Sequence, residues 1–271
     1  YLVVESWLND QATNETRGVL SSTYVTVNFT VITVGQMMVT LVQPSSFVLF
    51  SIASVLMSLA AVPIVLTRSS QPPPITFVRF RPARMIRLSP TGTIAVFIIG
   101  LASGAFWALG PSYAASASDN VASAAAFMSA AVLGGALAQL PAGRVSDRLD
   151  RRLVIVVLAG ACILTGGAVA VTAGGSAMWF GLGALFGAAL LPAYAVASAH
   201  VFDFADRADY VEISAGLLLV YGLGSTIGPV LSSVAVEAMG QAGLFAFIGA
   251  TQVALAGFVL LRMSRREGLP T

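Results

Sequence analysis

The ionisable side chains of this sequence offer little material for catalysis. His200 is the only histidine and Cys162 the only cysteine. An active site or a metal centre needs several such groups converging at one place. We therefore predict no enzyme, no bound metal and no other cofactor. His200 is a candidate proton relay, because an ionisable group in an apolar segment is expensive to bury; alternatively, it reaches water at a helix end.

The remaining charged residues are few and lie between long apolar stretches. Of 271 residues, 10% are charged and 57% hydrophobic, whereas a soluble domain carries about 25% charged residues. The mean hydropathy is +0.87. A membrane span needs about 20 apolar residues, and helices satisfy their own backbone hydrogen bonds in lipid. We predict an all-α polytopic membrane protein with about eight spans, at 19–41, 47–66, 92–112, 121–140, 153–172, 177–199, 213–235 and 242–261.

The basic residues are all arginines, and they are confined to alternate connections. The 14 arginines fall before the first span, in the 67–90, 141–152 and 200–212 connections, and at the C-terminal end. The positive-inside rule places these parts, including the C-terminus, in the cytoplasm. We expect an integral protein of a bacterial inner (plasma) membrane. The net charge of +2 then reflects topology in the lipid bilayer, and no nucleic-acid partner is predicted.

One arginine-rich connection carries a motif with regular spacing, formed by Gly143, Asp147, Arg148, Arg151 and Arg152. It resembles the G-x-x-x-D-R-x-G-R-R signature of the major facilitator superfamily (MFS), with Asp150 in place of the second glycine. Residues 5–9 and 214–229 resemble the small bacterial YcaD-like branch of that superfamily. The resemblance implies a transporter of twelve helices in two bundles.

The motif residues have physical roles that follow from their types. Gly143 allows close helix contact, Asp147 is predicted to lie at a helix N-terminus, and the three arginines can pair with carboxylates. In the superfamily this connection braces the two bundles on the cytoplasmic face. The resemblance therefore implies a cytoplasmic gate with partners at Glu5, Asp10 and Glu15. The alternative is an arginine cluster that only orients the chain.

The two sides of the 67–90 connection show a weak repeat. A shift of 193 residues aligns Asp10 with Asp203 and Gly35 with Gly228, which makes span 19–41 the counterpart of span 213–235. We predict that 1–66 holds the end of helix 4 and helices 5 and 6 of an N-terminal bundle. Residues 67–90 would be a cytoplasmic central linker, and 91–271 a C-terminal six-helix bundle, helices 7 to 12, with a tail. Four earlier helices of the same chain would then be missing before Tyr1.

Polar and aromatic side chains within the spans are candidates for lining a solute cavity; they are Tyr24, Asn28, Gln36, Trp107, Gln139, Tyr194 and Tyr221. About half of such residues would instead be interfacial anchors or helix contacts. Gly224 and Gly228 would allow close helix packing, and Pro229 a kink.

These features predict a secondary active transporter that moves a small organic solute by alternating access, with H+ as a candidate coupling ion. No carboxylate is predicted near the membrane centre, which favours a neutral, amphipathic or weakly charged solute. One alternative is a multidrug-type efflux carrier of the same fold. In a different class, the alternatives are a channel or a non-transporting membrane scaffold.

Overall fold

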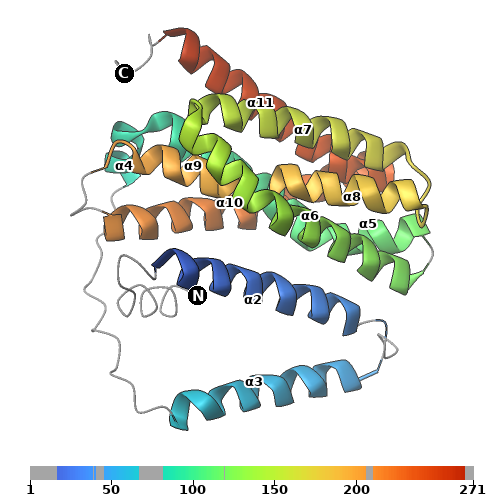
Figure 1. The fold of residues 1–271 in the computed structure, drawn as a ribbon. Coiled ribbons are helices and arrows are strands. Elements are labelled where there is room, and N and C mark those ends of the chain that lie inside the picture. The colour runs from blue at the N-terminus through green and yellow to red at the C-terminus, as the bar shows by residue number, and fades with distance from the viewer. Residues whose placement is uncertain are drawn as a thin grey trace. The chain divides into compact units, whose positions relative to one another are not determined.

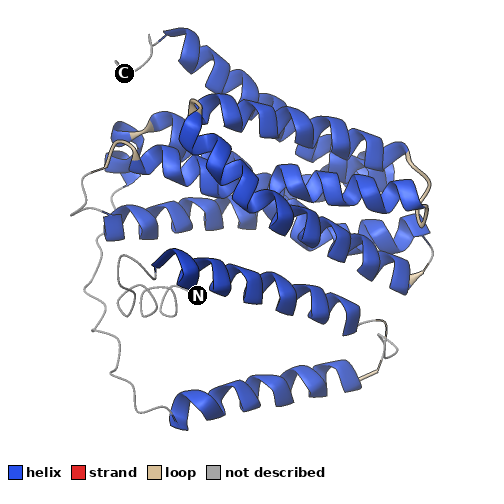
Figure 2. Ribbon diagram, viewed as in Figure 1, coloured by secondary structure: helices blue, strands red, loops and turns tan. Residues whose placement is uncertain are grey.

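The computed structural model describes residues 17–38, 40, 46–66, 82–118, 120–205 and 210–265 (Figure 1). These residues form helices joined by short turns, and none of them lies in a strand (Figure 2). The chain divides into two compact units, Tyr1–Phe77 and Val78–Thr271. The predicted all-α architecture is therefore confirmed over the described ranges.

The first unit contains two long helices, α2 (Arg17–Met38) and α3 (Val48–Leu66). At a rise of about 1.5 Å per residue, each is about 30 Å long, the thickness of a bilayer core. The α3 helix exposes large apolar side chains, with Phe50 73% and Met57 79% exposed. Two of its serine hydroxyls bond locally, since Ser54 Oγ donates to the carbonyl of Phe50 at 2.9 Å and Ser58 Oγ to that of Ser54 at 3.0 Å. Such a surface suits contact with lipid.

The described part of the second unit consists of apolar helices. Five apolar helical segments are long enough to cross a bilayer, namely Pro90–Ser118, Val121–Arg148, Arg151–Val171, Ala177–Phe202 and Glu212–Ser264. The last segment holds two helices separated by the turn η2 (Gly240–Ala242). The helices of this unit are α4 (Pro82–Leu88), α5 (Pro90–Ser118), α6 (Val121–Arg148), α7 (Arg151–Val171), α8 (Ala177–Leu190), α9 (Ala193–Phe202), α10 (Tyr210–Met239) and α11 (Gly243–Arg265).

Short polar turns separate these spans, and their side chains cap the helices. The Asn120 side chain accepts a hydrogen bond from the backbone N–H of Ala122 at 2.8 Å at the start of α6. Ser176 caps α8 by accepting from Trp179 N at 3.2 Å. Gly175 and Gly240 have φ angles of 77° and 68°, a backbone region that favours glycine. The chain thus reverses in few residues between apolar helices.

Two elements differ from the sequence prediction. The span predicted over 177–199 agrees with the apolar segment Ala177–Phe202, but its helix is interrupted between α8 and α9 at Leu191 and Pro192. The ring of Pro192 has no N–H to donate to the carbonyl of Ala188, which interrupts the helical ladder. The predicted 67–90 linker contains the short helix α4 at its end. Its Met85 is 4% exposed, and this burial stabilises a helix that the sequence alone left as a loop.

Helices α5 and α10 are in close contact through glycines on both helices. A Cβ added at Gly100 or Gly104 would overlap the backbone of Tyr221 or Ser225, respectively. A Cβ at Gly228 would overlap the carbonyl of Leu101. The Ser225 hydroxyl also donates to the carbonyl of Gly100 at 3.3 Å. Small residues four positions apart on each helix let the two backbones approach.

An equivalent contact joins α6 and α8. An added Cβ at Gly134 would overlap the backbone of Ala184, and one at Gly187 the backbone of Ala131. Helix α5 packs on α10 and α11, and α8 packs in the same way on α6 and α7. Helices α7 and α11 pack on each other. The helices α5–α6–α7 and α8/α9–α10–α11 therefore form two similar sets of three, which run in opposite directions because consecutive spans alternate.

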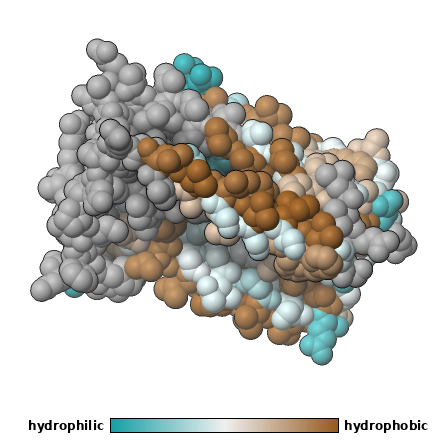
Figure 3. Space-filling view, turned by 90° about the horizontal axis from the view of Figure 1, so that it is seen from below, coloured by the Kyte–Doolittle hydropathy of each residue, from teal (hydrophilic) through white to brown (hydrophobic). Residues whose placement is uncertain are grey.

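Two apolar clusters fill the interior of this unit. One is rich in aromatic rings and includes Phe106, Tyr113, Phe127, Trp179, Phe186 and Phe245. Its polar atoms are paired, because Trp179 Nε1 donates to Tyr113 Oη at 3.3 Å and that hydroxyl donates to the carbonyl of Val169 at 2.9 Å. The other cluster is aliphatic and joins α4, α5, α7, α9, α10 and α11. Much of the described surface is also apolar on the face drawn in Figure 3.

The glycine contact between α5 and α10 can be tested by adding a methyl group. Replacing Gly228 with alanine should destabilise the protein by about 1–3 kcal/mol, because the new Cβ must displace the Leu101 backbone. The matched control is Gly222→Ala on the same helix, where an added Cβ meets no described atom within 4 Å. Thermal unfolding of the purified protein in detergent measures both. Equal melting temperatures for the two variants would refute the contact.

Candidate functional site

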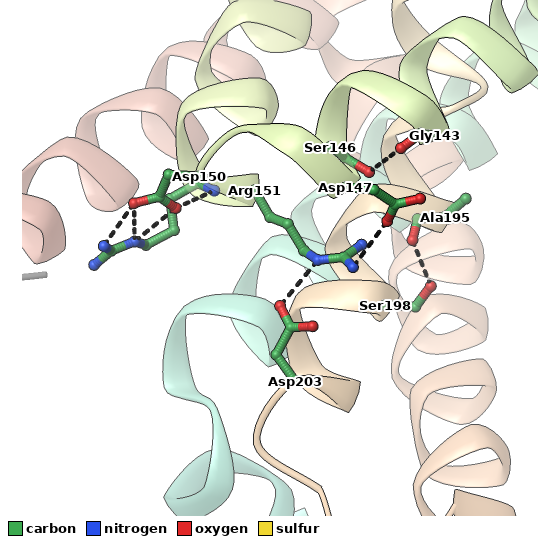
Figure 4. A network of polar contacts seen from close by, with 9 residues as sticks. Gly143, Ser146, Asp147, Asp150, Arg151, Ala195, Ser198 and Asp203 are labelled. Atoms are coloured by element: carbon green, nitrogen blue, oxygen red, sulfur yellow. Dashed lines mark hydrogen bonds and ion pairs between the residues drawn. The ribbon is translucent and has the colours of Figure 1, made fainter. Parts of the chain in front are cut away.

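The motif residues lie where α6 ends and α7 begins (Figure 4). Asp150 is the N-cap of α7, and its Oδ1 accepts a hydrogen bond from the backbone N–H of Arg152 at 2.9 Å. The Arg152 guanidinium donates three hydrogen bonds to that carboxylate, from Nε to both oxygens at 3.1 Å and from a terminal nitrogen to Oδ2 at 2.7 Å. The residue that departs from the family signature therefore has a local role, which is to start α7.

These bonds also affect how Asp150 titrates. The hydrogen bonds from Arg152 hold the pKa of the Asp150 carboxyl below its usual range. A carboxyl with a depressed folded-state pKa stabilises the fold above its unfolded pKa. That contribution is lost as the pH falls through the folded pKa. The α7 cap is thus fully charged at neutral pH.

Arg151 connects the ends of three helices. Its terminal nitrogen lies 3.0 Å from Asp147 Oδ1, and its Nε lies 2.9 Å from Asp203 Oδ2 at the end of α9. Figure 4 shows the guanidinium between the two carboxylates. Because Asp147 lies in the last turn of α6, the prediction that it lies at a helix N-terminus is wrong within this unit. The helix dipole disfavours an anion there, and Arg151 offsets that effect.

The other motif residues make fewer contacts. Arg148 is exposed and forms no ion pair with a described carboxylate. The carbonyl of Gly143 accepts a hydrogen bond from Ser146 Oγ at 2.8 Å. A Cβ at Gly143 would meet no described atom within 4 Å, so the close helix contact predicted there is not seen in the described chain. The predicted gate partners Glu5, Asp10 and Glu15 lie outside the described residues.

The cavity candidates are spread over both units, and the structure brings two of them together. The rings of Tyr194 and Tyr221 meet edge to face with centroids 4.9 Å apart. Tyr194 lies in the first turn of α9, directly after the break, and Tyr221 lies in α10. This pair therefore places two aromatic side chains at an interrupted helix.

The remaining candidates are not gathered at this pair by any contact in the described chain. Trp107 is 37% exposed on α5, and Gln139 is half-buried on α6. Asn28 and Gln36 are half-buried on α2, in the other unit. The side chain of Tyr24 lies outside the described atoms. Gly224 and Gly228 lie at the contact with α5, and Pro229 lies inside α10, which continues through it.

His200 is buried near the end of α9, at 7% exposure. Its ring lies edge to face against Phe204 with centroids 5.3 Å apart. It lines a small cavity together with Arg152 and Arg262. None of the described hydrogen bonds joins its ring to a carboxylate, so its role as a proton relay stays a prediction.

Sequence reasoning missed three polar residues that the structure makes prominent. Asp203 was used only to align the repeat. Its ion pair with Arg151 can be recognised only when α9 is folded beside α7. Arg262 was counted only among the basic residues that orient the chain. Gln252 is 2% exposed within α11, and its Nε2 has no hydrogen-bond partner in the described structure. An amide inside a span was the available signal for Gln252.

Comparison with known proteins agrees with this architecture. A sequence model of the Major Facilitator Superfamily matches residues 92–270. An MFS-type transporter of Yersinia pestis (strain Pestoides F) is 29% identical over 272 residues, covering 98% of this chain and 68% of the relative. The MFS-type transporter YcaD of Shigella flexneri is 28% identical over 98% of this chain and 68% of its own length. An MFS-type transporter of Enterobacter sp. (strain 638) is 28% identical over 99% of this chain and 69% of its own length.

The chain therefore belongs to the Major Facilitator Superfamily. It is a polytopic, all-helical integral membrane protein of a transporter family, and the predicted likeness to YcaD is confirmed.

The ion pair between Arg151 and Asp203 can be measured by a double-mutant cycle. We expect Arg151→Gln and Asp203→Asn each to lower the melting temperature, and the double variant to lose less than the sum. The coupling should be about 0.2–1 kcal/mol, because both side chains are partly exposed to solvent. A cycle of Asp203→Asn with Arg144→Gln is the control, since Arg144 forms no ion pair with a described residue. Additive effects in both cycles would contradict the pairing.

Proposed function

We propose that this protein is a secondary active transporter that moves a small organic solute across a bacterial inner membrane by alternating access. The observation that carries this proposal is the break between α8 and α9 beside the tyrosine pair. Transporters commonly place their solute sites at interrupted helices near the middle of the membrane. The break at Leu191 and Pro192 divides the segment Ala177–Phe202 close to its midpoint.

The groups at this break suit a neutral or weakly charged solute. Pro192 leaves the Ala188 carbonyl without its helical donor, and the Tyr194 and Tyr221 rings lie 4.9 Å apart. In the described helices, carboxylates occur only near helix ends, at Asp147, Glu212 and Glu237. A strongly cationic solute would find no partner at the break. If H+ is the coupling ion, His200 is the candidate relay.

The proposed carrier has two bundles. Its C-terminal bundle would be residues 91–271, with α5 to α11 as helices 7 to 12. Residues 1–66, with α2 and α3, would supply helices 5 and 6 of the N-terminal bundle, and 67–90 the linker. The two similar three-helix sets of the second unit support this assignment, because nested inverted repeats are the usual construction of such a bundle.

The arginine cluster would act as a gate at the cytoplasmic face. The Asp147–Arg151–Asp203 network fixes the ends of α6, α7 and α9 to one another. The exposed Arg148 remains available to carboxylates of the N-terminal bundle, for which Glu5, Asp10 and Glu15 are the candidates. Contacts that exist only when the cytoplasmic faces are closed would favour the outward-facing state.

Solute counterflow in proteoliposomes tests the transport proposal. We expect exchange of one member of a labelled panel of neutral sugars, amino acids and amphipathic amines. Tyr194→Ala and Tyr221→Ala should slow that exchange by about tenfold, the equivalent of about 1.4 kcal/mol of lost contact. The matched controls, Tyr194→Phe and Tyr221→Phe, keep the rings and should retain exchange. Downhill flux without counterflow would indicate a channel, and full exchange in the alanine variants would remove the solute site from this pair.

The orientation can be tested with single cysteines and an impermeant thiol reagent in intact cells. We expect cysteines at Ala173 and Ala242 to react and cysteines at Arg144 and Ser264 to resist, because only the latter pair lies on the arginine side. All four positions are exposed. The native Cys162 is 1% exposed and should give no background. Labelling of Ser264→Cys but not Ala242→Cys would reverse the orientation.

A further inference from the structure

A small cavity lies at the arginine-bearing end of the second unit. Its volume is about 30 Å³, and the lining that matters here consists of Ser89, Thr91, Arg152, His200, Phe204 and Arg262. These residues come from the start of α5, the start of α7, the end of α9 and its following turn, and the end of α11. Two guanidinium groups, an imidazole and the first turn of a 29-residue helix therefore share one cavity.

One of these groups has unused hydrogen-bonding capacity. The Nε of Arg262 is buried and has no hydrogen-bond partner in the described chain. No described carboxylate forms an ion pair with this guanidinium. The His200 ring is 7% exposed, and its described contact is with the Phe204 ring. A buried donor without an acceptor is unfavourable, so the cavity is suited to an acceptor from outside the protein.

We propose that this cavity binds a phosphate group, and that the phosphate belongs to the headgroup of an anionic membrane lipid. The planar arginine fork matches phosphate oxygens, and the dipole at the N-terminus of α5 favours an anion. Arg152 already pairs with Asp150 at 2.7 Å, whereas Arg262 pairs with no carboxylate among the described residues, which leaves its charge for the ligand. The site thus carries the opposite charge to its ligand.

The position and size of the cavity favour a lipid headgroup over a transported solute. Four spanning helices begin or end around it, which places it at the level of the lipid headgroups. A volume of about 30 Å³ admits one small group, whereas pockets for whole organic ligands measure about 300–1,000 Å³. The acyl chains of a bound lipid would remain outside, against the apolar surface of the helices.

Melting temperatures of the purified, full-length protein in detergent test the proposal. The probes are dioctanoyl phosphatidylglycerol, dioctanoyl phosphatidylcholine, inorganic phosphate, and sodium chloride at matched ionic strength. We expect phosphatidylglycerol to raise the melting temperature of the wild type. Its apparent affinity should be about tenfold weaker for Arg262→Gln, which loses charge-assisted hydrogen bonds. Arg262→Lys keeps the charge without the fork and should fall between the two.

The matched control is Arg144→Gln, which removes the same charge from an exposed position that does not line the cavity. It should respond to phosphatidylglycerol as the wild type does. A response to phosphatidylglycerol alone identifies the lipid as the source, and weaker binding of phosphatidylcholine agrees with repulsion of its choline by the arginines. A response to inorganic phosphate at equal affinity would overturn the lipid assignment in favour of the free ion. Equal responses of Arg262→Gln and Arg144→Gln, or none in the wild type, would overturn the site.

Discussion

Close approach of helix backbones at glycine is the contact on which the second unit depends. Inside a bilayer, the packing of one helix on another removes no apolar surface from water. Helices there associate instead through van der Waals packing at short range. Gly100 and Gly104 lie against the backbone of α10, and Gly228 lies against that of α5. The same arrangement recurs where Gly134 and Gly187 join α6 to α8. These two contacts hold together the two sets of three helices.

The glycine contacts also bear on the pair of tyrosine rings. Tyr221 contributes its carbonyl to the contact with Gly100, so its backbone is held against α5, while its ring meets Tyr194 on α9. The helix before Tyr194 is interrupted at Pro192, and an interrupted helix resists bending less than a continuous one. A group bound beside these rings would therefore link a fixed helix, α10, to the more adaptable α9. That combination of rigid and adaptable parts would suit the alternating access proposed above.

Local chemistry was readable from the sequence, and contacts between distant residues were not. The absence of charges over long stretches predicted the spans, and the signature at 143–152 predicted the family. The break at Pro192 was missed because hydropathy does not distinguish one long helix from two short ones. Asp147 was assigned to the wrong helix end, since the signature gives spacing but not the residue at which α6 stops. The pairing of Arg151 with Asp203 spans 52 positions (203 − 151) and depends on the packing of α9 beside α7.

The arginines at one end of the unit satisfy two requirements at once. Orientation in the membrane needs only positive charge, and lysine would supply it equally well. The geometry here uses more than charge, because Arg151 directs two different nitrogens to Asp147 and Asp203. Arg152 likewise donates hydrogen bonds to both carboxylate oxygens of Asp150. A lysine has one nitrogen on a flexible stem and cannot reproduce either arrangement. The forked contacts therefore favour a role in joining helix ends over one in topology alone.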